Sequence, residues 1–584
     1  MFKILSYLGR KEWTMIGAAV IFIVFQVWLD LQLPEYMGTI TTLVTSGGDM
    51  NEVLKYGGYM VLCALGSLAT AVVVGYLAAR MAASHAQTLR SRQFAKVDSF
   101  SMTEINKFST ASLITRSTND VTQVQMIVTM GLQIVVKAPI LAVWALVRIS
   151  NGSIEWTMAM AVAIIIMITL FAAVIWLVIP KFKKMQSLTD DLNRVVRENL
   201  TGLSVVRAYN AEGYQEGKFE NANKELTDTQ LYTSRAMAVM MPAIALIMNL
   251  LLLSIYWIGA ILIDGAGMAQ RPDLFSDMIV FSSYSMQILM AFMMIAMLFI
   301  MLPRAQVAAK RINEVLDTEP TIIDGNVTET DGSERGEIEF RNVSFKYQGA
   351  ANHVLENINF KVEKGETAAF IGSTGSGKST LINLMIRFYD VSEGAVLVDG
   401  TDVRDYKLET LHDKIGYVPQ RAVLFSGTVR SNVAFGVTEE QIEEEEVREA
   451  VRIAQGKEFV ELMDGAYDAS VSRGGANVSG GQKQRISIAR AIAKRPEIYV
   501  FDDSFSALDY KTDRNLRTAL KKETHGATNI IVAQRIGTIM DADKIIVLDE
   551  GKIVGIGKHK ELLDTCEVYK DIAMSQLSEK ELGI

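Results

Sequence analysis

Residues 367–380 read TAAFIGSTGSGKST, and they join an expected strand to an expected helix. The strand is Thr367–Ile371, and the helix that follows ends near Phe388. A glycine-rich turn in this context, closed by lysine and serine, matches the phosphate-binding loop (P-loop) of nucleotide-binding α/β domains. Its backbone N–H groups surround phosphates, Lys378 contributes a positive charge, and the Ser379 hydroxyl can reach Mg²⁺. The stretch therefore predicts a nucleotide site.

A second apolar strand supplies the carboxylates that such a site needs. Ile498–Phe501 is apolar, and Asp502 and Asp503 follow it directly. Parallel sheets bind ligands at the carboxyl ends of their strands, so Asp502 is placed to hold Mg²⁺ through water. Two aspartates after a strand are a weak signal alone. Together with the P-loop they indicate a site for a magnesium nucleotide.

The composition divides the chain into two different halves. The chain has 584 residues, which exceeds one typical domain, and 49% of them are hydrophobic. All six tryptophans precede residue 260, which indicates a membrane half followed by a soluble half. The two cysteines, Cys63 and Cys566, exclude a disulfide framework and a cysteine-rich zinc site. The net charge of −8 argues against wholesale binding of nucleic acid.

Six stretches of the N-terminal half are apolar and near or above the ~20 residues that cross a bilayer as a helix. They are Thr14–Leu29, Gly57–Ala79, Met126–Val147, Trp156–Ile179, Ala236–Ile263 and Met278–Pro303. The loops after the second and fourth stretches are long and carry many lysines and arginines. By the positive-inside rule, the N-terminus, both long loops and the C-terminal half are expected in the cytoplasm.

Two features inside the spans each allow a functional and a structural interpretation. Lys137 is costly at membrane depth, so it should face a cavity or a partner charge, or snorkel to a surface. Since no acidic partner is visible near it, a packed or snorkelling lysine is the favoured interpretation. Methionines recur on one helical face of the sixth span, at Met286, Met290, Met293, Met297 and Met301. This methionine stripe can line a cavity for varied apolar ligands, or it can contact lipid and neighbouring helices.

The composition of the chain changes from apolar to polar after the sixth span. Residues 317–336 are polar and rich in Asp, Glu, Thr and Gly, which is typical of a linker. Strand-like segments begin near Glu337. We therefore predict a transmembrane domain over 1–316, a linker over 317–336 and a nucleotide-binding domain over 337–584. The expected fold class is an α-helical six-span membrane domain with long cytoplasmic helix extensions, followed by an α/β P-loop ATPase domain.

The soluble half carries a further motif, residues 479–482, which read SGGQ and precede the helix Ile486–Ala493. Together with a P-loop, this motif resembles the signature sequence of ATP-binding-cassette (ABC) ATPases. Six spans with two long cytoplasmic loops ahead of the ATPase resemble an ABC exporter half-transporter. In that arrangement 108–114 and 207–214 hold the places of the two coupling helices. The resemblance covers nearly the whole chain.

The resemblance assigns roles to individual residues. Tyr347 resembles the aromatic residue that stacks on adenine, Gln420 the glutamine that links the metal to the membrane domain, and 506–509 the dimer-contact loop. The implied ATP-binding residues are Tyr347, Gly372, Ser373, Thr374, Gly375, Ser376, Gly377, Lys378, Ser379, Thr380, Gln420 and Asp502, of which Ser379, Gln420 and Asp502 are the implied Mg²⁺ ligands. The signature residues implied for the partner's ATP are Ser479, Gly480, Gly481 and Gln482.

Two positions depart from the family pattern. Asp503 takes the place of the glutamate that acts as general base, and Gln534 takes the place of the switch histidine. Aspartate is one methylene shorter than glutamate, and a displacement of about 1 Å can cost on the order of 10²-fold in rate. Glutamine cannot titrate as histidine can. Both are therefore expected to be degenerate catalytic positions.

The resemblance also implies a partner, because ABC cassettes pair head to tail, with each ATP between one subunit's P-loop and the other's signature motif. A homodimer of this chain would have two weak sites, whereas a heterodimer pairs its intact signature motif with an intact partner. We therefore expect one half of a heterodimeric bacterial multidrug exporter in the plasma (inner) membrane, in contact with membrane lipid and moving a drug- or lipid-like substrate. The alternatives are a homodimeric lipid or peptide exporter and an ATP-gated channel or regulatory subunit.

Overall fold

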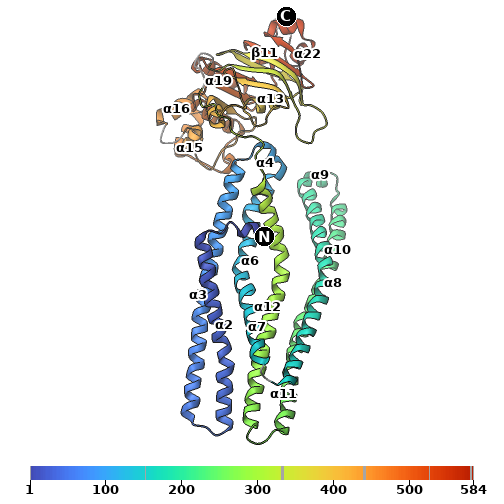
Figure 1. Cartoon of the computed structure of the whole chain (residues 1–584). Helices are drawn as coiled ribbons and strands as arrows, with labels where there is room; N and C mark the ends of the chain where they lie inside the picture. Colours follow the sequence, from blue (N-terminus) through green and yellow to red (C-terminus); the bar gives the residue numbers. More distant parts are fainter. Residues whose placement is uncertain are drawn as a thin grey trace. The chain divides into compact units, whose positions relative to one another are not determined.

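The computed structural model describes residues 2–150, 153–329, 335–437, 442–524, 526–578 and 582. The chain divides into two compact units. The membrane unit contains 1–98 and 110–318, and the soluble unit contains 99–109 and 319–584. Figure 1 shows long helices in the first and sheets with shorter helices in the second. The fold class predicted from the sequence is confirmed.

The membrane unit consists mainly of long helices. Among the described residues, six helical stretches are long and apolar enough to cross a membrane. They are Arg10–Thr45 (α2), Met50–Asp98 (α3), Thr110–Ser150, Ile154–Thr201 (α8), Glu212–Gly265, which contains α10 (Glu212–Ala238) and α11 (Met240–Gly265), and Arg271–Leu298, which lies within α12 (Arg271–Asp317). Helix α3 has 49 residues and α8 has 48, about twice the ~20 that a bilayer requires. The chain is therefore a multi-pass membrane protein whose helices continue beyond the bilayer.

The third of these stretches is not a regular α-helix. It consists of α5 (Thr110–Thr115), η1 (Arg116–Asp120), α6 (Val121–Gly131), η2 (Leu132–Lys137) and α7 (Ala138–Ser150). Both η1 and η2 are π-helical. Such wide turns are rare and shift the register of the side chains that follow them.

Lys137, at the end of η2, has an acidic partner. Its Nζ atom lies 3.2 Å from Oδ2 of Asp30 on α2, and Ser67 on α3 donates a hydrogen bond to Oδ1 of the same carboxylate over 2.5 Å. The expectation that Lys137 has no acidic partner is therefore wrong, and of the alternatives for this residue the partner charge is the one that the structure contains. Asp30 follows the apolar stretch that ends at Leu29, so the partner is distant along the chain and adjacent only in the fold.

A buried hydrogen bond joins α12 to α2, and part of the methionine stripe of α12 is exposed. The Tyr284 hydroxyl of α12 donates to the carbonyl of Leu31 on α2 over 2.9 Å. Met286, Met290 and Met297 are exposed on the described chain. Both interpretations of the stripe need such an uncovered face, so the choice between cavity lining and lipid contact stays open.

The soluble unit contains a four-stranded antiparallel sheet in the order β2-β1-β4-β5, a six-stranded sheet in the order β12-β11-β3-β10-β9-β6, and the pair β7-β8. The bounds are β1 (Ile338–Phe345), β2 (Leu355–Val362), β3 (Thr367–Gly372), β4 (Glu393–Val398), β5 (Thr401–Asp402), β6 (Ile415–Val418), β7 (Gly427–Thr428), β8 (Ser470–Val471), β9 (Ile498–Asp502), β10 (Thr528–Val532), β11 (Lys544–Asp549) and β12 (Lys552–Gly557).

The central strands of the six-stranded sheet have continuous apolar sequences because both of their faces are buried. In β3, Ala369 and Ile371 pack into one hydrophobic core, and Ala368 and Phe370 pack into another. A parallel strand that is buried on both faces has no polar side to alternate with. Strand β10 is the parallel neighbour of both β3 and β9, so the carboxyl ends of these three strands lie at one edge of the sheet.

Helices cover the sheets of the soluble unit. They are α13 (Lys378–Met385), α14 (Leu408–Lys414), α15 (Val429–Val433), α16 (Glu444–Ile453), α17 (Lys457–Glu461), α18 (Gly480–Ala493), α19 (Tyr510–Glu523), α20 (Ile536–Ile539), α21 (His559–Thr565) and α22 (Glu567–Gln576). Helix α13 follows β3, and α18 precedes β9. These two connections place the P-loop and the signature motif.

One short helix from the N-terminal half belongs to the soluble unit. Helix α4 (Met102–Phe108) begins with a capping box between Ser101 and Glu104 and ends at Ser109, which has φ +59. The stretch 108–114, expected to be one coupling helix, therefore spans a break between α4 and α5. The stretch 207–214, expected to be the other, contains the end of α9 (Leu203–Ala208), a turn and the start of α10.

Candidate functional site

The P-loop connects β3 to α13 through a turn that needs glycine. Gly377 is the N-cap of α13 with φ +99, and a Cβ atom there would lie 2.5 Å from Leu355 Cδ2. The Lys378 ammonium donates to the carbonyls of Gly372 and Ser373 over 2.9 and 2.7 Å. Burial lowers the pKa of Lys378. The loop thus presents a partly desolvated cation and backbone N–H groups, a combination that binds phosphates.

Oxygen donors suited to Mg²⁺ lie beside the loop. The Ser379 hydroxyl donates to Oδ1 of Asp502, at the end of β9, over 3.2 Å. Burial and the charge of Asp503 both raise the pKa of Asp502. Among the described residues there is no cluster of three His, Cys, Asp or Glu side chains that could hold a metal alone. A hydroxyl and a carboxylate fit Mg²⁺ that takes its other ligands from nucleotide phosphates and water.

Asp503 and Gln534, the two positions that depart from the family pattern, contact each other. Gln534 donates from Nε2 to Oδ2 of Asp503 over 2.8 Å, and Gln420 donates to the same oxygen over 3.2 Å. The backbone N–H of Asp503 is fixed by the carbonyl of Val532 at 3.0 Å. Burial raises the pKa of Asp503. Two amides therefore occupy one oxygen of the only carboxylate at the expected general-base position, and neither amide can accept a proton as histidine can.

Tyr347 lies next to the P-loop helix. Its hydroxyl is 3.0 Å from Oγ1 of Thr380. Its ring packs edge-on against Phe345 and Tyr389, with centroid separations of 4.8 and 5.2 Å. The role of Tyr347 as a platform for adenine stays a prediction. Tyr389 was not among the predicted residues, and its place just after the P-loop helix is the only sequence signal that it gives.

The signature motif begins a helix on a different part of the soluble unit. Ser479 is the N-cap of α18: its Oγ accepts from the N–H of Gln482 over 3.3 Å, and the Gln482 side chain accepts from the N–H of Ser479 over 2.8 Å. A Cβ atom on Gly480 would meet nothing within 4 Å. Free N–H groups at a helix N-terminus attract anions.

The predicted site residues thus form two groups in the fold. The first group is the P-loop with Gln420, Asp502, Asp503 and Gln534, at the carboxyl ends of β3, β6, β9 and β10 in one sheet, together with Tyr347, which follows β1 of the other sheet and reaches Thr380 of the P-loop helix. The second group is the signature motif. Within the described residues, the fold does not join the P-loop and the signature motif by a hydrogen bond.

Comparison with known families matches both parts of the chain. Residues 16–319 match the family described as ABC transporter transmembrane region, and residues 355–506 match the family described as ABC transporter. The second match includes the P-loop, the signature motif and Asp503.

Similar proteins cover nearly the full length. An uncharacterized ABC transporter ATP-binding protein of Mycobacterium tuberculosis is 41% identical over 95% of this chain and 94% of its own. A second one, from Bacillus subtilis, is 34% identical over 99% of this chain and 98% of its own. The ATP-dependent lipid A-core flippase of Pseudomonas fluorescens is 32% identical over 78% of this chain and 75% of its own.

A solved structure shares the fold. The structure of a bacterial Atm1-family ABC exporter with ATP bound superposes with a TM-score of 0.78, at 24% identity, over 97% of this chain and 98% of that one.

Proposed function

The chain belongs to the ABC transporter family, as a transmembrane domain fused to a transport ATPase, and from this premise we propose that it is one half of a heterodimeric exporter. Its own P-loop binds ATP and Mg²⁺ but hydrolyses ATP poorly. Its signature motif completes the active site of the partner. The exported substrate is hydrophobic or amphipathic.

The contact between Gln534 and Asp503 is the observation that carries this proposal. Hydrolysis requires a carboxylate that holds the attacking water in line and accepts its proton. The shorter Asp503 side chain shares one oxygen with two amide donors. These donors oppose the rise in the Asp503 pKa that burial produces, and they occupy an oxygen that would otherwise be available to orient the attacking water. The arrangement supports ATP binding with slow turnover at this site.

ATP binding itself does not depend on those two residues. Lys378 and the loop amides bind phosphate, Tyr347 stacks on adenine, and Ser379 and Asp502 hold Mg²⁺ together with Gln420. Bound Mg²⁺ would neutralise charge on the β- and γ-phosphates. Burial raises the pKa of Asp502, and a bound divalent cation would lower it.

The exposed start of α18 supports the need for a second subunit. Gly480 has open space around it, and the Ser479 hydroxyl proton is free to donate while its oxygen caps the helix. Those donors suit the γ-phosphate of an ATP molecule that another chain holds. Since this chain's own catalytic carboxylate is weak, we infer that the second chain differs from it and has an intact site.

The proposed substrate class and membrane rest on other observations. The uncovered methionine stripe of α12 suits apolar ligands of varied shape. One similar protein is named for the transport of lipid A-core, which supports a lipid-like substrate. We propose that the soluble unit lies in the cytoplasm, which the Lys- and Arg-rich long loops support, and that the spans lie in the plasma membrane.

Vanadate trapping of photoreactive ATP tests the proposal. The chain is co-expressed with a second half-transporter that carries glutamate and histidine at the positions of Asp503 and Gln534, and the purified complex is labelled with and without vanadate. We expect vanadate-dependent label on the partner chain and vanadate-independent label on this chain. Equal vanadate-dependent label on both chains, or full ATPase activity of this chain purified alone, would contradict the degenerate-site model and favour a homodimer.

A further inference from the structure

The helix α22 near the C-terminus contacts the segment that contains Gln534. Gln576 is the final residue of α22, and its Nε2 donates to the carbonyl of Gln534 over 2.8 Å. The Oε1 atom of the same side chain accepts from the N–H of Ile536, also over 2.8 Å. One side-chain amide therefore joins two backbone groups on either side of Arg535, and we name this pair of hydrogen bonds the clamp.

The Ile536 N–H needs an acceptor that its own helix does not supply. Ile536 is the first residue of α20, a helix of four residues, and it is 0% exposed. The first N–H groups of a helix have no partner within that helix, and a buried N–H without a partner is costly. Arg535, the N-cap residue, gives no side-chain cap. Gln576 thus supplies, from a different helix, an acceptor that the local sequence lacks.

Helix α22 is anchored in the hydrophobic core, so its last residue has a fixed position. Tyr569 and Ala573 are fully buried, and the Tyr569 hydroxyl lies 2.7 Å from Nδ1 of His559 on α21. Tyr569, Ala573 and Gln576 are four and three residues apart, a spacing that places them on one face of the helix. The buried face of α22 therefore carries Gln576 to α20.

The clamped residues hold two groups at the P-loop site. Gln534 donates to Oδ2 of Asp503 over 2.8 Å. Nη2 of Arg535 donates to the carbonyl of Ser506 over 3.2 Å, in the stretch 506–509 that resembles the dimer-contact loop. A side chain at a reactive site keeps its geometry only where further hydrogen bonds fix the backbone that bears it. The clamp fixes that backbone for both contacts.

We propose that Gln576 is a positioning residue of this ATP site, which holds Gln534 and Arg535 against the segment 503–509. It acts through the backbone of the switch position and does not touch the nucleotide. Helix α22 then determines how the side chain at position 534 reaches the side chain at position 503. This inference rests on the proposed function, because it requires that ATP binds at this P-loop.

Hydrogen–deuterium exchange of the full-length transporter in detergent separates the two bonds of the clamp. Gln576→Ala removes both, so exchange should become about five-fold faster at 534–540 and at 503–509, as for the loss of one hydrogen bond. Gln576→Glu keeps an oxygen that accepts from the Ile536 N–H but repels the Gln534 carbonyl. Exchange should then become faster at 503–509 and stay native at 534–540. A residue that only caps α20 would leave 503–509 unchanged in Gln576→Glu.

The matched control is Ser575→Glu, which places the same charge on an exposed neighbour of Gln576 in α22. The Ser575 hydroxyl donates to the carbonyl of Ile572 within its own helix, so its loss should leave exchange native at 534–540 and 503–509. Native exchange at 503–509 in both Gln576 variants would overturn the inference. Faster exchange there in the control would overturn it as well, because added charge alone would explain the effect.

Steady-state ATPase gives a second measurement, in a transporter whose chain carries Asp503→Glu together with Gln534→His. Adding Gln576→Glu should lower kcat of the gained activity about ten-fold and leave KM for ATP unchanged, because the P-loop and Tyr347 bind the nucleotide without the clamp. An unchanged kcat would overturn the inference. If the two substitutions give no gain, the account of the weak site under the proposed function fails, and the exchange result alone decides the role of Gln576.

Discussion

Gln534 and Asp503 form a hydrogen bond of 2.8 Å at the position where hydrolysis needs a free carboxylate. The two residues come from different segments, since Asp503 follows β9 and Gln534 follows β10. They meet because β9 and β10 are parallel neighbours, with Asp502 opposite Val532. Changes at one of the two positions therefore alter the environment of the other.

The first prediction concerns the repaired variant, by which we mean the chain with Asp503→Glu and Gln534→His, the residues of the family pattern. Asp503→Glu lengthens the carboxylate by one methylene, and Gln534→His supplies a group that can titrate. We expect the double variant to raise steady-state ATPase of the assembled transporter, and each single change to have a smaller effect because the two side chains are in contact. Vanadate-dependent labelling of this chain should appear together with the added activity.

The control for this prediction is Lys378→Ala in the repaired background. The P-loop lysine is needed at this site whatever the general base is, so its loss should return activity to the starting level. Activity that persists after Lys378→Ala would have to arise elsewhere, and the repair of this site would be rejected.

The second prediction concerns the ion pair between Lys137 and Asp30. The Lys137 and Asp30 side chains are 22% and 26% exposed, so each charge is largely removed from solvent. Lys137→Met leaves the Asp30 carboxylate without its cation, and we expect a loss of about 2 kcal/mol, smaller than for a fully buried pair. Thermal unfolding of the purified protein in detergent measures this loss as a lower midpoint temperature.

A double-mutant cycle separates the pair from either residue alone. Adding Asp30→Asn to Lys137→Met should recover part of the stability, because no unpaired charge is left. Lys55→Met, at an exposed lysine of α3, is the matched control and should leave the midpoint unchanged. If the losses of the two single variants simply add, the ion pair has no energetic role.

The third prediction concerns the methionine stripe of α12. Met290 is 48% exposed and Met297 is 54% exposed, so both are available to a ligand or to lipid. Replacing both by alanine should change transport across a panel of apolar compounds more than it changes basal ATPase activity. The matched control replaces Met158 and Met241, which are 65% and 64% exposed on other spanning helices. Equal effects of both pairs would indicate lipid contact.

The strands β3 and β9 and the P-loop are predictable from the sequence because burial and phosphate binding restrict the residues that can occupy them. Strands β3 and β9 are buried on both faces, so they read as uninterrupted apolar runs, and a glycine-rich turn must follow β3 for the backbone to approach phosphates. The partner of Lys137 could not be predicted, because Asp30 is far away in the chain and only helix packing brings the two together. The same holds for Tyr389, whose neighbours Asn106 and Tyr347 come from separate segments.

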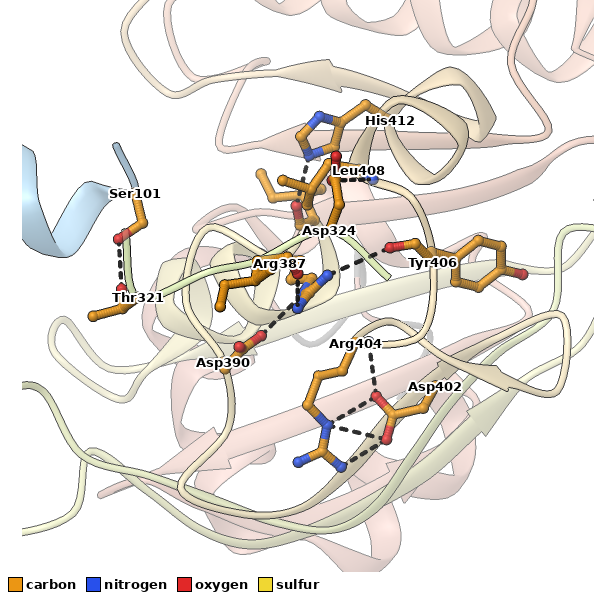
Figure 2. Close-up of polar contacts among 12 residues, drawn as sticks. Ser101, Thr321, Asp324, Arg387, Asp390, Asp402, Arg404, Tyr406, Leu408 and His412 are labelled. Atoms are coloured by element: carbon orange, nitrogen blue, oxygen red, sulfur yellow. Dashed lines mark hydrogen bonds and ion pairs between the residues drawn. The ribbon is translucent and has the colours of Figure 1, made fainter. Parts of the chain in front are cut away.

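The boundaries between the two units are also set by packing contacts, which the sequence composition does not show. The linker predicted over 317–336 is polar in composition, yet its described residues after 319 group with the soluble unit. The backbone N–H of Gly325 donates to the carbonyl of Tyr406, although the polar composition of this segment predicts a backbone that is hydrogen-bonded to water. Helix α4 joins the soluble unit for the same reason, because its contacts are with residues distant along the chain. Figure 2 shows one of them, between the hydroxyls of Ser101 and Thr321, which are 2.9 Å apart.

The last prediction compares the two halves of a nucleotide site that this chain presents. Ser479 and Gly481 lie at the start of α18, where a hydroxyl and backbone N–H groups can stabilise charge on the partner's γ-phosphate. Gly481→Asp introduces a carboxylate that repels phosphate, although an acidic residue at a helix N-terminus favours the helix itself. We therefore expect a loss of turnover of about 10²-fold or more with the fold retained, as for removal of an essential transition-state donor.

Asp503→Ala is the comparison that decides where hydrolysis takes place. It removes the carboxylate of this chain's own weak site, so steady-state ATPase of the heterodimer should fall far less than with Gly481→Asp or Ser479→Arg. Ser575→Arg, at an exposed serine of α22, controls for the added bulk and charge and should have no effect. If Asp503→Ala silences the complex as completely as the Ser479 change does, this chain's own site is a working catalytic site, and the degenerate-site model fails.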